Sequence, residues 1–273
     1  RKPAHAYGWD IMPRAVSAGI WRPVYLEESP ATALTEVYVR TRTATREQAL
    51  LDVTVSWRTD AACLDGFSLQ VSGVCGESRF ELTQPVTFTS AHLAVNVPAP
   101  RLWWPRGYGN ACLYDTRVVL LAGGRPVSAW QGRVGIRTVV LERNDLNTVD
   151  HPGRFQFRIN GEPIFCKGSN WVPADAFHSR DTERLPALLD RFRDMGCNML
   201  RCWGGSVYEP HLFYDICDRD GIMVWQDFAM ACAAYPQAPS FLEAMRREAA
   251  WVVRELRNHP SIVLWAGDNE CDC

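Results

Sequence analysis

The stretch IVLWAGDNE, residues 262–270, places five apolar residues before a glycine and three polar residues that end in Glu270. A short apolar run without alternation is typical of a strand that is buried on both faces, as in a parallel sheet. Three earlier runs have the same form, over Ile164–Lys167, Met199–Trp203 and Ile222–Trp225. The C-terminal half of the chain therefore predicts four buried parallel strands.

Apolar residues at helical spacing lie between these runs. They cover Leu185–Met195, Leu212–Cys217 and Phe241–Leu256, the last beginning after Ser240 as a capping residue. Strands that alternate with helices predict a parallel sheet covered by helices. Both a doubly wound sheet and half of a (β/α)8 barrel fit this pattern.

The residues that follow each predicted strand favour the barrel. These strand ends are Asn170–Trp171, Arg201–Trp203, Gln226–Asp227 and Asp268–Glu270. Barrel enzymes place their sites at the C-terminal ends of their strands. No G-x-G-x-x-G follows any strand, as a dinucleotide-binding sheet would require. We therefore predict that residues 151–273 form the first four units of a TIM barrel.

The N-terminal half of the chain has the alternating, β-branched pattern of antiparallel strands. Residues 29–150 predict an immunoglobulin-like β-sandwich. Residues 1–28 are too short to fold alone, and we interpret them as the end of a jelly-roll-like β-domain. The predicted fold class is thus multidomain, a β-sandwich plus α/β. The predicted sandwich strands are Leu34–Arg40, Leu50–Trp57, Phe67–Val71, His92–Val97, Leu113–Leu121 and Gly135–Leu141.

Composition excludes several kinds of partner and cofactor. A formal net charge of -2 gives no field that would attract nucleic acid or an anionic membrane, and no apolar run reaches the roughly 20 residues of a membrane span. We expect a soluble bacterial protein, whether cytoplasmic, periplasmic or secreted. The six histidines are scattered, so no metal and no cofactor is predicted. The ten cysteines are interpreted as buried small hydrophobic residues in preference to disulfides.

Glu270 is the strongest candidate for chemistry. An acid at the end of an apolar strand would lie in a partly apolar pocket beneath Trp265, where the protonated form is favoured and can protonate a leaving oxygen. A solvated loop carboxylate is the alternative. Asn269 offers a donor and an acceptor for a sugar hydroxyl, or caps a following helix.

Four further residues at strand ends are candidates for supporting roles. Arg201 and Asp227 could pair with each other or orient the acid, and a structural ion pair is an equal alternative. Trp171 and Trp203 could each stack on the apolar face of a sugar ring.

Several of these segments resemble one protein family. Residues 257–270, RNHPSIVLWAGDNE, are similar to the acid/base segment of family 2 glycoside hydrolases, whose barrels carry Asn-Glu at the end of strand four. The spacing W-x-G-x-N-E resembles the β-mannosidase branch, as do residues 167–175, 201–205 and 225–228. Residues 7–10 and 19–24 are similar to the end of the amino-terminal sugar-binding-like domain of that branch.

The resemblance implies an activity and a site. Its expected activity is retaining exo-β-mannosidase, with Glu270 as acid/base and Asn269 on the sugar 2-hydroxyl. Arg201 matches an arginine that supports the nucleophile. The residues implied to hold the terminal sugar are Trp9, Asp10, Trp171, Trp203 and Asp227.

The second carboxylate of a retaining enzyme comes, in this family, from strand seven. We therefore expect the chain to be a fragment that is inactive alone and needs the rest of the same protein to complete its barrel. Its expected partner is an oligosaccharide or glycoside. The alternatives are another exo-β-glycosidase of the family, such as a glucosaminidase or galactosidase, and a non-catalytic carbohydrate-binding protein.

Overall fold

The computed structural model describes residues 2–144, 148–150 and 153–271. The chain forms two compact units. A β unit comprises residues 26–104 and 109–165, and an α/β unit comprises residues 1–25, 105–108 and 166–273. The domain boundaries predicted at residues 28 and 150 stay a prediction. Within the described ranges, no helix has the length and apolar character needed to cross a membrane.

The β unit contains two antiparallel sheets whose apolar faces form one core. Every second residue of the central strand β2 is buried, including Leu51, Val53 and Val55, which lie in one cluster with Leu69 and Leu120 from the other sheet. This arrangement confirms the predicted sandwich. The first sheet has the order β1-β2-β5, with β1 at Ala33–Ala44, β2 at Gln48–Arg58 and β5 at Ser90–Pro98. The second has the order β4-β3-β6-β7, with β3 at Phe67–Cys75, β4 at Ser78–Pro85, β6 at Tyr114–Ala122 and β7 at Arg125–Val134.

A small third sheet corrects one predicted strand. It has the order β10-β9-β8, with β8 at Val139–Arg143, β9 at Phe155–Ile159 and β10 at Glu162–Ile164. Asn160 and Gly161 both have positive φ, the geometry of a two-residue hairpin turn. The prediction that Ile164–Lys167 is the first barrel strand is therefore wrong, because Ile164 ends this hairpin.

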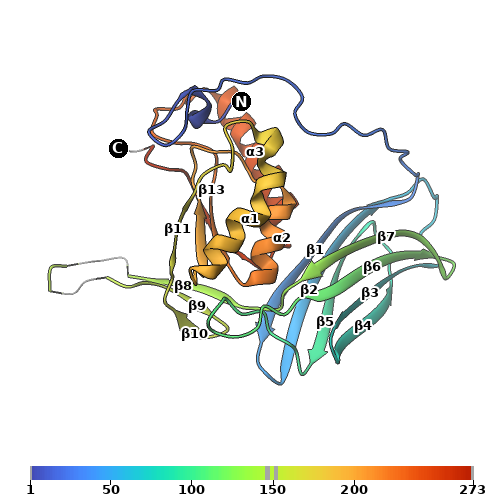
Figure 1. Cartoon of the computed structure of the whole chain (residues 1–273). Helices are drawn as coiled ribbons and strands as arrows, with labels where there is room; N and C mark the ends of the chain where they lie inside the picture. Colours follow the sequence, from blue (N-terminus) through green and yellow to red (C-terminus); the bar gives the residue numbers. More distant parts are fainter. Residues whose placement is uncertain (1, 145–147, 151–152, 272–273) are drawn as a thin grey trace. The chain divides into compact units, whose positions relative to one another are not determined.

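The α/β unit is built on four parallel strands (Figure 1). Their order is β11-β12-β13-β14, the order of the chain, which a barrel requires and a doubly wound sheet does not have. This order confirms the predicted start of a barrel. The strands are β11 at Gly168–Trp171, β12 at Met199–Cys202, β13 at Met223–Asp227 and β14 at Ile262–Ala266.

Three helices connect the four strands, and α1 and α2 lie side by side (Figure 1). Their apolar faces, including Leu185, Phe213 and Leu256, share a buried cluster with strand residues Leu200 and Val224. Helix α3 begins one residue before Ser240, which therefore does not cap it. Its bounds are Pro239–Leu256, those of α1 are Asp181–Asp194 and those of α2 are His211–Asp220. Short 3-10 helices, η1 and η2, cover Ala4–Tyr7 and His178–Arg180.

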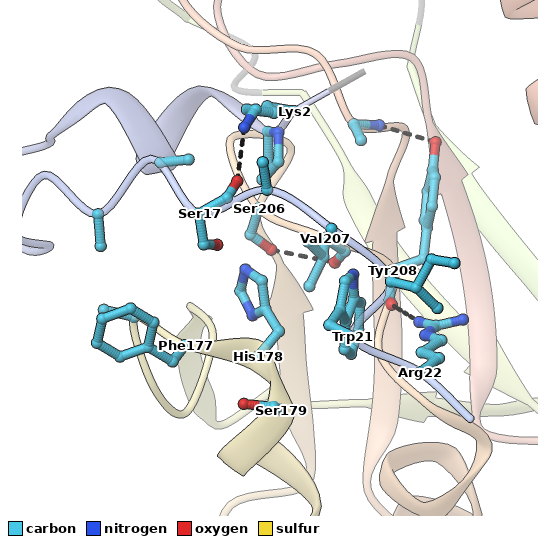
Figure 2. A pocket seen from close by; sticks show the side chains of 18 of the residues that line it. Lys2, Ser17, Trp21, Arg22, Phe177, His178, Ser179, Ser206, Val207 and Tyr208 are labelled. Atoms are coloured by element: carbon cyan, nitrogen blue, oxygen red, sulfur yellow. Dashed lines mark hydrogen bonds between the residues drawn. The ribbon is translucent and has the colours of Figure 1, made fainter. Parts of the chain in front are cut away.

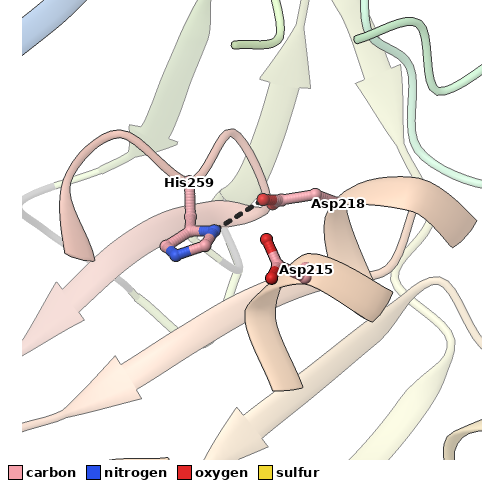
Figure 3. Close-up of side chains that lie close together, drawn as sticks. All are labelled: Asp215, Asp218 and His259. Carbon is pink, nitrogen blue, oxygen red and sulfur yellow. Dashed lines mark hydrogen bonds and ion pairs between the residues drawn. The ribbon is translucent and has the colours of Figure 1, made fainter. Parts of the chain in front are cut away.

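A buried aspartate joins helix α2 to the turn that precedes β14 (Figure 3). Asp218 accepts hydrogen bonds from the Ser261 backbone N–H at 2.9 Å and from His259 Nδ1 at 2.6 Å. Asp215 adds a third side chain, and ligand-type atoms of Asp215, Asp218 and His259 lie within 4.8 Å of one another. The sequence showed no such histidine–carboxylate group, because its members are far apart along the chain.

The cysteines depart from the sequence interpretation. The described cysteines form no disulfides with one another. Only Cys197, Cys202 and Cys217 are buried. Most of the others lie in turns or at strand ends, where a small side chain is not drawn into a core. Cys273 lies outside the described residues.

Candidate active site

Arg201 joins the C-terminal ends of the four parallel strands. Its Nη2 donates to Asp227 Oδ2 at 2.6 Å and to Asn269 Oδ1 at 2.9 Å. Its Nη1 lies 3.5 Å from Asn170 Oδ1, and its guanidinium carbon lies 5.9 Å from the ring centre of Trp225. Because parallel strands end at one edge, residues far apart in sequence meet at this single guanidinium.

Asp227 is fully enclosed at the end of β13. Its side chain has 0% exposure. The carboxylate accepts hydrogen bonds from Arg201, from the Gly204 N–H at 3.0 Å and from Trp225 Nε1 at 3.0 Å. Burial raises the pKa of Asp227, and the hydrogen bonds from Arg201 and the other donors oppose that rise. Every partner is a donor, so the ionised carboxylate is the satisfied form. The expectation that Asp227 holds the sugar stays a prediction, and the donors described here are all groups of the protein.

Two glycines after β12 allow a close approach of backbone segments. A Cβ on Gly204 would lie 2.4 Å from the Met230 carbonyl oxygen, and one on Gly205 would lie 2.0 Å from the ring of Trp203. Neither glycine has positive φ, so the requirement is space and not backbone conformation. The loop that contains Met230 is thereby held beside the end of β12.

The end of β14 pairs with the same loop. The Asn269 N–H donates to the Met230 carbonyl at 3.0 Å, and the Cys232 N–H donates to the Asn269 carbonyl at 2.9 Å. These bonds fix Asn269, which is 7% exposed. With its Oδ1 on Arg201, the amide directs Nδ2 to Cys232 Sγ and Glu270 Oε2, each at 3.3 Å.

Glu270 follows in a left-handed backbone conformation, with φ of 55°. A non-glycine residue in this region costs on the order of 1 kcal/mol and is common at functional sites. The residue is exposed, so the part of the chain that the structure describes does not form the expected apolar pocket beneath Trp265 around it. The Trp265 ring instead stacks on Phe228, with ring centroids 5.6 Å apart.

The N-terminal segment reaches this edge of the sheet within the α/β unit. The His5 backbone N–H donates to the Gly205 carbonyl at 3.0 Å. The Trp9 ring lies 5.1 Å from that of Trp203, centroid to centroid. Trp203 is 8% exposed, Trp9 is half-buried and Asp10 is exposed. The structure thus brings together three of the residues expected to hold the terminal sugar.

Trp171 lies elsewhere. It is 3% exposed and packs on Phe213 with ring centroids 5.1 Å apart. Its Nε1 donates to Glu209 at 2.9 Å. The expectation that Trp171 stacks on a sugar stays a prediction, and the ring lies in the buried cluster of the α/β unit.

Glu209 and Cys232 were missed in the sequence. Burial raises the pKa of Glu209 to about 8, and its Oε2 has no hydrogen-bond partner among the described residues. A glutamate before a proline in a polar loop gives no sign of such burial. The sequence indicated a functional position for Cys232 only weakly, because this residue belongs to the loop that follows Asp227 at the end of a predicted strand.

A cavity of about 580 Å³ lies between the N-terminal segment and the loops after β11 and β12 (Figure 2). Trp21, Phe177 and Tyr208 contribute to its wall, and Arg22 donates to the Tyr208 carbonyl at 3.3 Å. Glu270 and Asn269 do not line it. Its chemistry is therefore separate from that of the strand-end cluster.

Comparison with known proteins defines the class. Residues 32–137 match the family model described as glycosyl hydrolases family 2, and residues 154–273 match its TIM barrel domain. The two matches together span most of the chain, and the chain belongs to glycosyl hydrolase family 2. The predicted family resemblance is confirmed.

Within the family the chain is similar to β-mannosidases. It is 39% identical to beta-mannosidase B of Thermothelomyces thermophilus, over 99% of this chain and 31% of that protein. Against the mouse beta-mannosidase the identity is 36%, over 99% of this chain and 31% of the relative. The crystal structure of a beta-D-mannosidase from Dictyoglomus thermophilum superposes with a TM-score of 0.88 at 37% identity, covering 98% of this chain and 33% of that one. The chain thus spans about a third of the length of these relatives.

Proposed function

We propose that the complete protein is a retaining exo-β-mannosidase that removes terminal β-linked mannose from the non-reducing ends of oligosaccharides. The observation that carries the proposal is the Asn269–Glu270 pair at the end of β14, with the amide held by Arg201 at 2.9 Å. The similarity to β-mannosidases over nearly the whole chain supports the choice of sugar.

In this mechanism Glu270 acts twice. It first protonates the departing glycosidic oxygen, and it then removes a proton from the water that releases the sugar. Its exposure supports both steps, because substrate and water can reach the carboxyl group. Asn269 would donate from Nδ2 to the sugar 2-hydroxyl, since its Oδ1 is already held by Arg201.

The nucleophile is assigned outside the described residues. A retaining enzyme needs a second carboxylate about 5 Å from the acid/base. Asp227, at the end of β13, is fully enclosed, and its carboxylate cannot attack a sugar carbon. We assign Arg201 to support of the nucleophile, and Trp203, Trp9 and Asp10 to the terminal sugar.

The test compares hydrolysis of aryl β-mannoside, β-galactoside and β-glucosaminide by the complete protein. We expect the mannoside to have the highest kcat/KM. A preference for another sugar would assign the protein to a different branch of the family. Binding of mannosides without any hydrolysis would instead indicate a carbohydrate-binding protein.

A further inference from the structure

Cys232 lies on the loop after β13 and touches the Asn269–Glu270 pair. Its Sγ is 3.3 Å from Glu270 Oε2 and 3.3 Å from Asn269 Nδ2. Those two atoms are themselves 3.3 Å apart, so sulfur, amide nitrogen and carboxylate oxygen form a triangle.

The donors and acceptors of this triangle have a definite order. The Asn269 amide nitrogen carries only donors, because the amide oxygen faces Arg201. The sulfur therefore accepts from Asn269, and its S–H donates to the Glu270 carboxylate. Both described contacts of the carboxylate fall on Oε2.

The backbone holds Cys232 in place for this contact. Its N–H donates to the Asn269 carbonyl at 2.9 Å, and Ala231 and Asn269 form a parallel bridge. Cys232 and Glu270 both have positive φ, 46° and 55°. Two non-glycine residues in this conformation, facing each other across one bridge, indicate that the loop is shaped to bring the two side chains together.

We propose that Cys232 is a positioning residue for Glu270, holding the carboxyl group in the orientation from which it protonates the leaving oxygen. The catalytic part rests on the proposed function, whereas the thiol–carboxylate contact does not. Because Cys232 is exposed, its modification by a thiol reagent would displace the carboxylate.

The contact is tested first by the reactivity of the thiol in the purified chain. The Cys232 thiolate attacks the sulfenyl sulfur of methyl methanethiosulfonate, a mixed disulfide forms and methanesulfinate leaves. The Glu270 carboxylate disfavours the thiolate, so Glu270→Gln should increase the rate about threefold, part of the gain in thiolate being offset by lower nucleophilicity. Peptide mass spectrometry measures the rate.

Cys63 of the β unit and Cys166 of the α/β unit are matched controls, since both cysteines are exposed. The modification rates of Cys63 and Cys166 should be the same in the Glu270→Gln chain as in the unsubstituted chain. An unchanged Cys232 rate, or an equal change at all three cysteines, would overturn the proposed contact.

The positioning role is tested by activity of the complete protein. Cys232→Ala should lower kcat about tenfold on mannosides with poor leaving groups, leave activated aryl mannosides nearly unaffected and leave KM unchanged, because only poor leaving groups need a positioned acid. Cys232→Ser keeps a donor and should recover most of the loss. Equal losses on both substrate types, or no recovery by serine, would overturn the positioning role. A protein without mannosidase activity would refute the proposed function and leave the thiol test to decide the contact.

Discussion

Glu209 shows how burial decides the charge of a single residue. The side chain is almost fully buried against Trp171, and its pKa of about 8 keeps it protonated at neutral pH. Its pKa in the unfolded chain is near 4.5. Because the folded value is the higher one, the stabilisation is complete below about pH 4.5 and is lost as pH rises toward 8.

We therefore expect the free energy of unfolding of the α/β unit to fall between pH 5 and 9, by an amount on the order of 3–4 kcal/mol from this residue. Glu209→Gln should remove most of that dependence. Urea unfolding at several pH values measures it. If the free energy of unfolding changed equally with pH in wild type and in the Glu209→Gln variant, Glu209 would not be the source of the pH dependence.

Glu270 permits a sharper test of role. In the complete protein, Glu270→Gln should lower kcat by about 10²–10⁴ on mannosides with poor leaving groups and far less on activated aryl mannosides. Parallel kinetics on the two substrate types separate acid catalysis from binding. Equal losses on both would remove Glu270 from the acid role.

The role of a residue could be predicted from the sequence only where its position also indicated whether its side chain is exposed. Trp171 and Trp203 both end a predicted strand, yet the first is in the core and the second meets Trp9. The orientation of a side chain at a strand end depends on packing from other elements, which periodicity does not encode. For the same reason, the sequence indicated the Asn269–Glu270 pair but not its contact with Cys232.

At the scale of elements, the Arg201–Asp227 ion pair connects β12 and β13. Breaking a buried pair leaves an uncompensated charge, so Asp227→Ala should lower the free energy of unfolding by about 3–5 kcal/mol. Asp52, which pairs with the exposed Arg40 and Arg42, is the matched control, and its alanine variant should cost about 1 kcal/mol or less. Chemical denaturation compares the two, and similar losses would mean that burial adds nothing.

Two glycine-to-alanine variants test how tightly backbone segments from different elements are packed together. Gly204→Ala should destabilise the α/β unit by about 1–3 kcal/mol, because its Cβ would collide with the Met230 carbonyl. Gly267→Ala meets nothing within 4 Å and has no positive φ, so its effect should stay within about 0.5 kcal/mol. Thermal melts of the two variants provide the comparison. A tolerated alanine at position 204 would mean that the loop can move.

Elements with strong periodicity were predicted well, and two of the missed strands share a cause. Strands β4 and β7 were not predicted, and both lie at the edges of their sheet. An edge strand is only partly covered, so polar residues replace the expected apolar alternation. The first barrel strand was predicted too early in the sequence. Asn160-Gly161 is the turn of the β9–β10 hairpin and does not mark the start of the barrel.

For the whole molecule, we expect residues 1–273 alone to have no glycosidase activity. Acid catalysis by Glu270 cannot complete a retaining displacement without a second carboxylate. An activated aryl β-mannoside, incubated with the purified chain and with the complete protein, tests this directly. Turnover by the chain alone would require a nucleophile among its own residues.

The bond between His5 and Gly205 also has a consequence for biosynthesis. It connects positions 200 residues apart, and the strands of the β unit are encoded between them. At about 5–20 residues per second, a ribosome needs roughly 10–40 s to reach Gly205 after completing His5. During that interval the Gly205 carbonyl that receives the His5 N–H has not been made, while the β unit has time to fold. Residues 1–25 are thus made well before the loop after β12 that they contact.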